Sequence, residues 1–134
     1  MEKKIGKFFR YPKKTKRFGE GGLRMKNINK HPKFTLITVV LNNKDLLEKT
    51  IKSVLRQNFK NFEYILIDGG SKDGTLAILK KYNAKLDYWL SEKDDGIYHA
   101  FNKGMELSRG EYIGIINSDD TYRPNALSII SKYI

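Results

Sequence analysis

Apolar and polar positions alternate from residue 34 onward in blocks that predict strands and helices in turn. Short apolar runs predict four strands, at residues 34–41, 64–67, 86–90 and 112–116. Apolar residues at helical spacing predict the helices, at residues 45–57, 75–82, about 97–107 and from Pro124 onward. This alternation implies right-handed crossovers and an α/β fold, in which a parallel sheet has helices on both faces. The uninterrupted first run further predicts a strand buried on both sides.

Charge divides the chain near residue 33. The 134 residues carry a formal net charge of +11, but residues 1–33 hold 12 Lys and Arg against two acidic residues, and residues 34–134 hold 14 against 13. We therefore expect a basic N-terminal arm over residues 1–33, with no helical or strand period, and one domain over residues 34–134. The arm is interpreted as a solvated extension, as an attachment to an anionic membrane surface or as a nucleic-acid-binding segment. The acidic loops of the near-neutral domain argue against nucleic acid.

Location is inferred from missing signals. The longest apolar stretch, residues 36–41, is far shorter than the about 20 residues of a membrane-spanning helix. The N-terminus lacks the apolar run of a secretory signal, and the absence of Cys excludes disulfides and thiolate sites. We expect a cytoplasmic protein, which would be peripheral at the inner face of the membrane if the arm binds lipid.

Polar segments follow each predicted strand, where ligands bind in parallel sheets. They are residues 42–44, 68–74, 91–96 and 117–120. None has the glycine pattern of a dinucleotide fold or a phosphate-binding loop, so the charge of a phosphorylated ligand must be neutralised otherwise. Asp119 and Asp120 offer hard oxygen ligands that suit Mg²⁺ or Mn²⁺ bridged to a phosphate, and the alternative is that they cap the helix near Pro124.

The remaining acidic residues also have two interpretations. Asp68, which precedes two glycines, either accepts hydrogen bonds from a base N–H or ribose hydroxyl or stabilises the turn, with Ser71 and Asp73 capping the next helix. The third segment is interpreted as a solvated acidic loop, formed by Glu92, Asp94 and Asp95. His99 is interpreted as a surface or hinge residue, since the sequence offers it no orienting partner.

Five motifs follow the order of the strands. They are TVVLN at residues 38–42, DGGSKDGT at 68–75, SEKDDGIYHAFNKG at 91–104, GEYI at 110–113 and NSDD at 117–120. Each is modest, but in this order they make residues 34 to about 130 resemble family 2 glycosyltransferases of the GT-A fold. The subgroup that the chain is most similar to builds bacterial surface polysaccharides.

The resemblance implies transfer of a sugar from a nucleotide-diphosphate sugar to an acceptor hydroxyl, in surface polysaccharide or lipopolysaccharide biosynthesis. It implies a saccharide or lipid-linked acceptor, inversion at the anomeric carbon, and a Mg²⁺ or Mn²⁺ ion. By this resemblance the metal ligands are Asp119 and Asp120, with Asp120 as the principal one. The nucleotide-binding residues that it implies are Val39, Leu41, Asn42, Asp68, Asn102 and Asp119.

The chain departs from the family pattern in three places. Leu41 stands where an aromatic residue often stacks on the base, and Asn117 stands where an Asp often begins the acidic motif. Family members continue into a later half that supplies the acceptor site and the catalytic base. We therefore expect only a donor-binding half here, with no base assigned and with Leu127 and Ile130 exposed where later elements would pack. The alternative hypothesis is a non-catalytic sugar-nucleotide-binding or assembly module whose basic arm docks to a membrane or partner.

Overall fold

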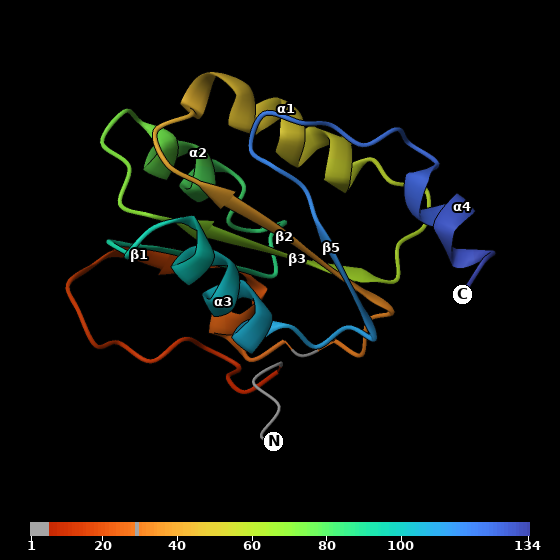
Figure 1. Ribbon diagram of the computed structural model, residues 1–134, viewed down its shortest axis with the longest axis horizontal. Coiled ribbons are helices and arrows are strands. Elements are labelled where there is room, and N and C mark those ends of the chain that lie inside the picture. Colours follow the sequence, from red (N-terminus) through yellow and green to blue (C-terminus); the bar gives the residue numbers. More distant parts are fainter. Residues whose placement is uncertain (1–5, 29) are drawn as a thin grey trace.

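A computed structural model describes residues 6–28 and 30–134 and shows one five-stranded sheet, in the order β1-β4-β3-β2-β5 (Figure 1). The strands are β1 (Arg17–Gly21), β2 (Phe34–Val40), β3 (Phe62–Asp68), β4 (Tyr88–Glu92) and β5 (Tyr112–Ile115). The helices are the 3-10 helix η1 (Leu23–Lys26) and the α-helices α1 (Lys44–Leu55), α2 (Thr75–Lys81), α3 (Ile97–Leu107) and α4 (Ala126–Ser131). Residues 1–5 and 29 of the expected basic arm lie outside the described residues.

Four strands of the sheet are parallel, as the alternating pattern predicts. Strand β2 pairs with β3 on one side and β5 on the other, and β3 pairs with β4. All seven residues of β2 are buried, which confirms a strand covered on both faces. The α/β fold expected from the sequence is therefore confirmed.

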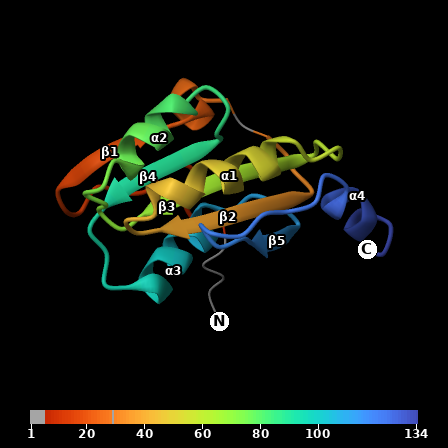
Figure 2. The same ribbon diagram turned by 90° about the horizontal axis from the view of Figure 1, so that it is seen from above.

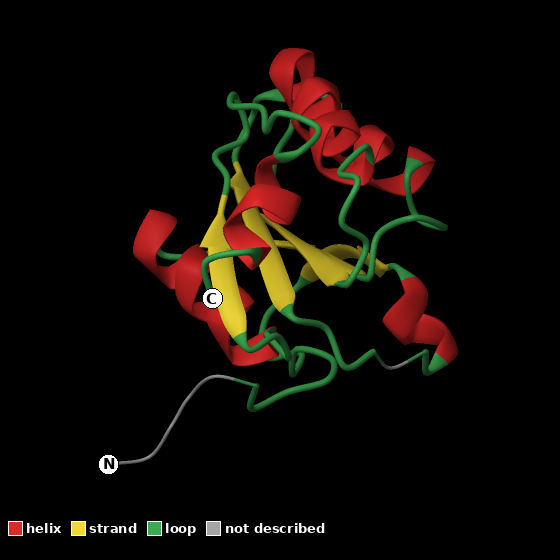
Figure 3. Cartoon of the chain, turned by 90° about the vertical axis from the view of Figure 1, so that its right-hand side faces the viewer, coloured by secondary structure: helices red, strands yellow, loops and turns green. Residues whose placement is uncertain are grey.

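Helices cover both faces of this sheet (Figures 2 and 3). Apolar residues of α1, α2 and α4 form one core layer, with Leu47, Leu79 and Leu127 among its buried members. The opposite layer contains residues of α3, against which Phe8 and Tyr11 of the N-terminal segment also pack. Among the described residues, no helix has the length and apolarity that crossing a membrane requires.

The N-terminal segment contributes a strand that the sequence pattern does not predict. Strand β1 pairs antiparallel with β4 at the edge of the sheet, so the expectation of no strand period in residues 1–33 is wrong for this stretch. The two residues of β1 that face Trp89 are Gly19 and Gly21, where an added Cβ would come within 2.8 and 2.4 Å of its ring. Because both inward positions are glycines, β1 has no alternating apolar pattern to detect.

Strand β4 begins two residues later than predicted. The Asp87 carboxylate accepts a hydrogen bond from the Tyr64 amide at 2.8 Å, and the ladder with β3 starts only at Tyr88. Glu92 is consequently the last strand residue and is buried, so its interpretation as part of a solvated loop is wrong.

The last helix also differs from its prediction. Helix α4 begins at Ala126, because the Pro124 carbonyl accepts a hydrogen bond from the Asn58 amide at 2.9 Å and does not bond within the helix. Leu127 is buried against the core, which corrects the expectation that it is exposed. Ile130 is 45% exposed, as expected.

Candidate functional site

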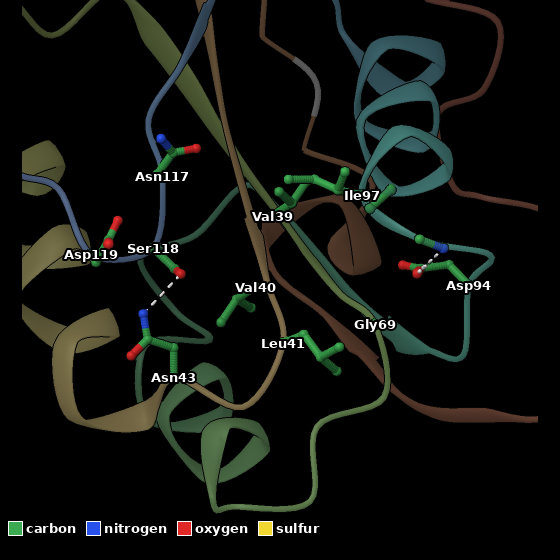
Figure 4. A pocket seen from close by; sticks show the side chains of 12 residues that line it. Val39, Val40, Leu41, Asn43, Gly69, Asp94, Ile97, Asn117, Ser118 and Asp119 are labelled. Atoms are coloured by element: carbon green, nitrogen blue, oxygen red, sulfur yellow. Dashed lines mark hydrogen bonds between the residues drawn. The ribbon is translucent and has the colours of Figure 1, made fainter.

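A cleft of about 440 Å³ opens at the carboxyl ends of the central strands, which is where ligands bind in parallel sheets (Figure 4). Figure 4 shows Asn117, Ser118 and Asp119 on one side and Asp94 and Ile97 on the other. The residues lining the cleft are Val39, Val40, Leu41, Asn43, Gly69, Asp94, Gly96, Ile97, Ala100, Asn117, Ser118 and Asp119. Apolar side chains therefore separate two polar walls.

The end of β2 supplies the apolar part between the walls. Leu41 is 60% exposed, which leaves a large apolar surface for a ligand at the mouth of the cleft. The next residue, Asn42, adopts a left-handed conformation with φ of 51°, which Asn tolerates better than most residues. Its backbone amide donates a hydrogen bond to Ser71 Oγ at 2.7 Å, and its side-chain Oδ1 accepts one from the Lys72 backbone amide at 2.7 Å. Asn42 thus ties the β2–α1 turn to the β3–α2 loop and does not itself line the cleft.

Asp68 holds the β3–α2 loop from within the protein. Its carboxylate is fully buried and accepts hydrogen bonds from the Ser91 hydroxyl at 2.6 Å, the Ser71 amide at 3.0 Å and the Ser71 hydroxyl. These bonds agree with the interpretation of Asp68 as a turn-stabilising residue, and it is not among the residues that line the cleft. The following Gly69 does line it.

Asp73 fixes the end of the same loop. Its carboxylate accepts hydrogen bonds from the Thr75 hydroxyl at 2.6 Å and amide at 3.1 Å, at the first residue of α2, and from the Lys44 amide at 3.1 Å, at the first residue of α1. The Thr75 hydroxyl is the main reason that the pKa of Asp73 lies below its ordinary value. The charged carboxylate therefore joins the starts of two helices beside the cleft.

One wall of the cleft, the acidic wall, is the turn after β5 that contains residues 117–120, and contacts from α1 hold it in place. The Thr50 hydroxyl lies within hydrogen-bonding distance of the Ser118 carbonyl at 3.1 Å and of the Asp120 carbonyl at 2.6 Å. The side-chain Nδ2 of Asn43 donates a hydrogen bond to Ser118 Oγ at 3.1 Å. These contacts fix the backbone of the turn, while the Asp119 and Asp120 residues stay exposed. Helix α4 has no side-chain hydrogen bond at its N-cap, so the interpretation of the acidic pair as a helix cap is not observed.

Asp94 forms the opposite wall and has one unsatisfied oxygen. Its Oδ1 accepts a hydrogen bond from the Gly96 amide at 3.2 Å. Its Oδ2 is buried and receives no hydrogen bond from any residue that the structure describes. A Cβ added to Gly69 would lie 3.2 Å from this oxygen, so the glycine provides the room that the carboxylate occupies. A buried acceptor without a donor is costly in the unliganded protein.

The rest of this loop divides between exposed and anchored residues. Asp94 is half-buried, which corrects its interpretation as a solvated residue, whereas the Asp95 side chain is 97% exposed, as expected. His99 Nδ1 accepts a hydrogen bond from the Asp95 amide at 2.9 Å. This contact identifies the orienting partner that the sequence does not reveal, and it places His99 at the start of α3.

The donor set of the acidic wall fits a metal ion that is shared with a phosphate. Asp119 lines the cleft, and Asp120 Oδ2 lies 3.4 Å from the side-chain Nδ2 of Asn117 on the same turn. Within residues 6–28 and 30–134 no three acidic, His or Cys side chains form a metal-binding group. Mg²⁺ commonly binds through one or two carboxylates together with substrate phosphates and water. The turn therefore fits an ion that arrives with a diphosphate, and does not fit one held by protein side chains alone.

The structure brings together only part of the predicted site. Val39, Leu41 and Asp119 line the cleft, whereas four other predicted residues do not, namely Asn42, Asp68, Asn102 and Asp120. Asn102 is exposed on α3.

Several lining residues had no predicted role. Asn43 and Ser118 are in contact because β2 and β5 are neighbours in the sheet. The order of strands in the sheet cannot be predicted from the periodicity of the sequence. For Asp94 a signal existed, since it lies within a motif and two residues before the glycine that precedes a helix.

Comparison with known proteins assigns this architecture to one family. The family model of glycosyl transferase family 2 matches residues 35–134. An uncharacterized glycosyltransferase of Mycobacterium tuberculosis is 37% identical over 92 residues, which cover 68% of this chain and 35% of that protein. A PGL/p-HBAD biosynthesis glycosyltransferase of Mycobacterium bovis is 33% identical over 107 residues, covering 77% of this chain and 42% of that protein.

A solved structure supports the same relationship. The crystal structure of S. aureus TarS 1-349 in complex with UDP-GlcNAc matches with a TM-score of 0.67 and 27% identity, covering 76% of this chain and 31% of that one. The chain therefore spans less than half the length of each of these proteins.

Proposed function

The chain belongs to glycosyl transferase family 2, and from that premise we propose that its cleft binds the nucleotide-diphosphate sugar donor of a sugar transfer. The acceptor we propose is a hydroxyl of a saccharide or lipid-linked intermediate in surface polysaccharide or lipopolysaccharide biosynthesis, with inversion at the anomeric carbon. The biosynthetic name of the Mycobacterium bovis relative and the UDP-GlcNAc in the TarS complex support this class of reaction.

The observation that carries the proposal is the pair of unlike walls. Asp94 offers a buried oxygen that needs a hydrogen-bond donor, and Asp119 offers an exposed carboxylate across an apolar gap formed by Val39 and Leu41. A nucleoside diphosphate has matching parts, since its base and ribose carry N–H and O–H donors and an apolar ring, and its diphosphate requires cations. We therefore place the nucleoside at the Asp94 wall and the diphosphate at the Asp119 wall.

The roles of individual residues follow from this placement. Val39 and Leu41 would contact the base, and Asp94 would accept a hydrogen bond from a base N–H or a ribose hydroxyl. Asp119 and Asp120 would hold a Mg²⁺ or Mn²⁺ ion, which when bound neutralises the negative charge that develops on the departing diphosphate.

The remaining nucleotide-binding assignments concern residues outside the lining. Asn42 and Asp68 would act through the loop that they hold, because their side chains bond to Ser71 and Lys72. Asn102 on α3 is assigned to the nucleotide by family resemblance alone. Their contribution to UDP affinity would therefore be smaller than that of Asp94 or Asp119.

Direct binding tests the proposed donor site. We expect the chain to bind UDP with one-to-one stoichiometry in the presence of Mn²⁺, and to bind uridine far more weakly because the nucleoside lacks the charged diphosphate. Isothermal titration calorimetry with UDP, UDP-GlcNAc, GDP and uridine measures this order. Equal affinities for uridine and the nucleoside diphosphates would contradict a diphosphate subsite, and no binding of any nucleotide would contradict the donor site itself.

We further propose that the basic N-terminal segment contacts anionic lipid. Its exposed lysines include Lys13, Lys14 and Lys16, which precede β1. Each basic residue near an anionic surface contributes about 1 kcal/mol, so replacing these three by Gln is expected to weaken vesicle binding by about fivefold per charge. Sedimentation with phosphatidylcholine–phosphatidylserine vesicles at low and moderate salt measures the loss.

A second triple variant controls for total charge. Lys49, Lys80 and Lys85 are exposed on or beside α1 and α2, on the other side of the molecule from α3. Their replacement by Gln changes the net charge equally and is expected to leave most of the vesicle binding in place. If both triples lose binding alike, or if binding does not fall with salt, the lipid contact does not reside in the N-terminal segment.

A further inference from the structure

A buried row of charges joins the N-terminal segment to the elements that carry the Asp94 wall. Arg17 Nε and Nη2 each lie 2.9 Å from Glu92 Oε1, and Lys103 Nζ lies 3.0 Å from Glu92 Oε2. All three side chains are at most 7% exposed. The Lys103 ammonium has no aligned hydrogen bond to any described residue, so it meets Glu92 as an ion pair only. The row therefore links β1, β4 and α3 through charge.

Arg17 also organises the chain that precedes β1. Its guanidinium donates hydrogen bonds to the Tyr11 and Pro12 carbonyls, both at 3.1 Å. Burial opposes its positive charge, but the hydrogen bond and charge of Glu92, with smaller contributions from Tyr88 and Glu20, outweigh burial and raise the pKa of Arg17 above its ordinary value. The cation thus holds the preceding residues against the end of β4.

These contacts lie directly beside the cleft. Glu92 is the last residue of β4, and Asp94 follows two residues later. Lys103 lies on α3, whose first residues Ile97 and Ala100 line the cleft. Phe18 of β1 covers the neighbouring loop, since a Cβ on Gly70 would lie 3.3 Å from its ring.

The loop between Glu92 and α3 is mostly exposed, and its side-chain hydrogen bonds are local ones, from the Asp95 amide to His99 Nδ1 and from the Gly96 amide to Asp94 Oδ1. Lys93, Asp95 and Gly96 are exposed, and a Cβ on Gly96 would meet nothing within 4 Å. Exposed backbone with few packing contacts samples many conformations, and ordering it on ligand binding reduces affinity. An anchor at Glu92, where the loop begins, and another on α3, which follows the loop, reduce that loss.

We propose that Arg17 is a positioning residue for the donor cleft, which acts through Glu92 and Lys103 to hold Asp94 and the start of α3 in their binding arrangement. The proposal rests on the donor site proposed above. It adds a contribution from residues 7–21, which precede the residues that the family model matches. The N-terminal segment is then part of the binding machinery as well as an edge of the sheet.

The test compares Arg17 with a second buried arginine of the same segment. Arg24 is 2% exposed and its Nη2 lies 2.7 Å from Glu63 Oε1, near the start of β3, which is the end of the strand away from the cleft. We expect Arg17→Met to weaken UDP binding at least tenfold and Arg24→Met to change it less than twofold, although both lower the Tm. Calorimetry is done at a temperature at which circular dichroism shows both variants folded.

Two further variants separate positioning from stability. Arg17→Lys keeps the charge and is expected to recover part of the affinity, and Lys103→Met frees α3 and is expected to lose about as much as Arg17→Met. Lys103→Met also carries the test if Arg17→Met does not fold. The inference is overturned if Arg17→Met and Lys103→Met bind UDP like the unmodified chain, or if Arg24→Met loses as much affinity as they do. Failure of the unmodified chain to bind UDP would instead refute the donor site on which the inference rests.

Discussion

Mn²⁺ is expected to strengthen UDP binding by about tenfold to a hundredfold, and Asp119→Ala is expected to remove most of that gain. The reason is the incomplete donor set of the acidic turn, where the two proposed carboxylate ligands would need the diphosphate to supply others. Each ligand then completes the site for the other, and the coupling free energy is the same in both directions. Calorimetry with UDP in Mn²⁺, in Mg²⁺ and in chelator measures the gain.

The reciprocal measurement tests the same coupling from the metal side. Mn²⁺ alone is expected to bind weakly, and to bind more tightly by the same factor once UDP is present. Asp45, an exposed carboxylate in the first turn of α1, provides the matched control, because Asp45→Ala removes an equal charge elsewhere. Comparing Asp119→Ala with Asp120→Ala identifies the principal ligand. Equal UDP affinity in Mn²⁺ and in chelator would contradict a metal role for this turn.

Periodicity predicts most of the fold because buried strands and amphipathic helices leave direct marks in the sequence. The run at residues 34–41 and the spacing of Leu47, Ile51 and Val54 locate β2 and α1 within one or two residues. Strand β1 leaves no such mark, since its inward positions are Gly19 and Gly21 and its partner Trp89 lies far along the chain. Neighbouring residues therefore predict whether a segment is a helix or a strand, but they do not predict that β1 pairs with β4.

The roles of the site residues are harder to predict from the sequence, because each role depends on residues that are close in space but distant in the chain. Asp119 is predictable, since the segment that follows a strand of a parallel sheet lies at the edge where ligands bind. Asp68 is the last residue of its strand, and donors from Ser71 and Ser91 occupy its carboxylate. Asp94 is separated from β4 by one residue and its environment depends on Gly69, which only the fold brings beside it.

Asp94→Ala is expected to weaken UDP binding by about tenfold to a hundredfold while leaving the Tm unchanged or raised. A hydrogen bond to a charged acceptor contributes about 1.5–3 kcal/mol, and the alanine cannot accept one. In the unliganded protein Oδ2 has no donor among the described residues, so the alanine loses only the hydrogen bond of the Gly96 amide to Oδ1 and relieves an unsatisfied buried oxygen. Residues maintained for binding commonly show this combination of lost affinity and retained stability. Calorimetry and thermal unfolding of the same preparation measure both quantities.

The neighbouring Asp95 supplies the control, because it carries the same charge one residue away and its side chain is 97% exposed. Asp95→Ala is expected to bind UDP nearly as well as the unmodified chain, which separates a specific acceptor from the general field of the loop. Gly69→Ala provides a second approach, since its methyl group would come 3.2 Å from Asp94 Oδ2 and shift the carboxylate by a few tenths of an ångström without removing it. If Asp94→Ala and Asp95→Ala weaken binding equally, the unsatisfied oxygen is not the contact that holds the donor, and the nucleoside must bind elsewhere along the cleft.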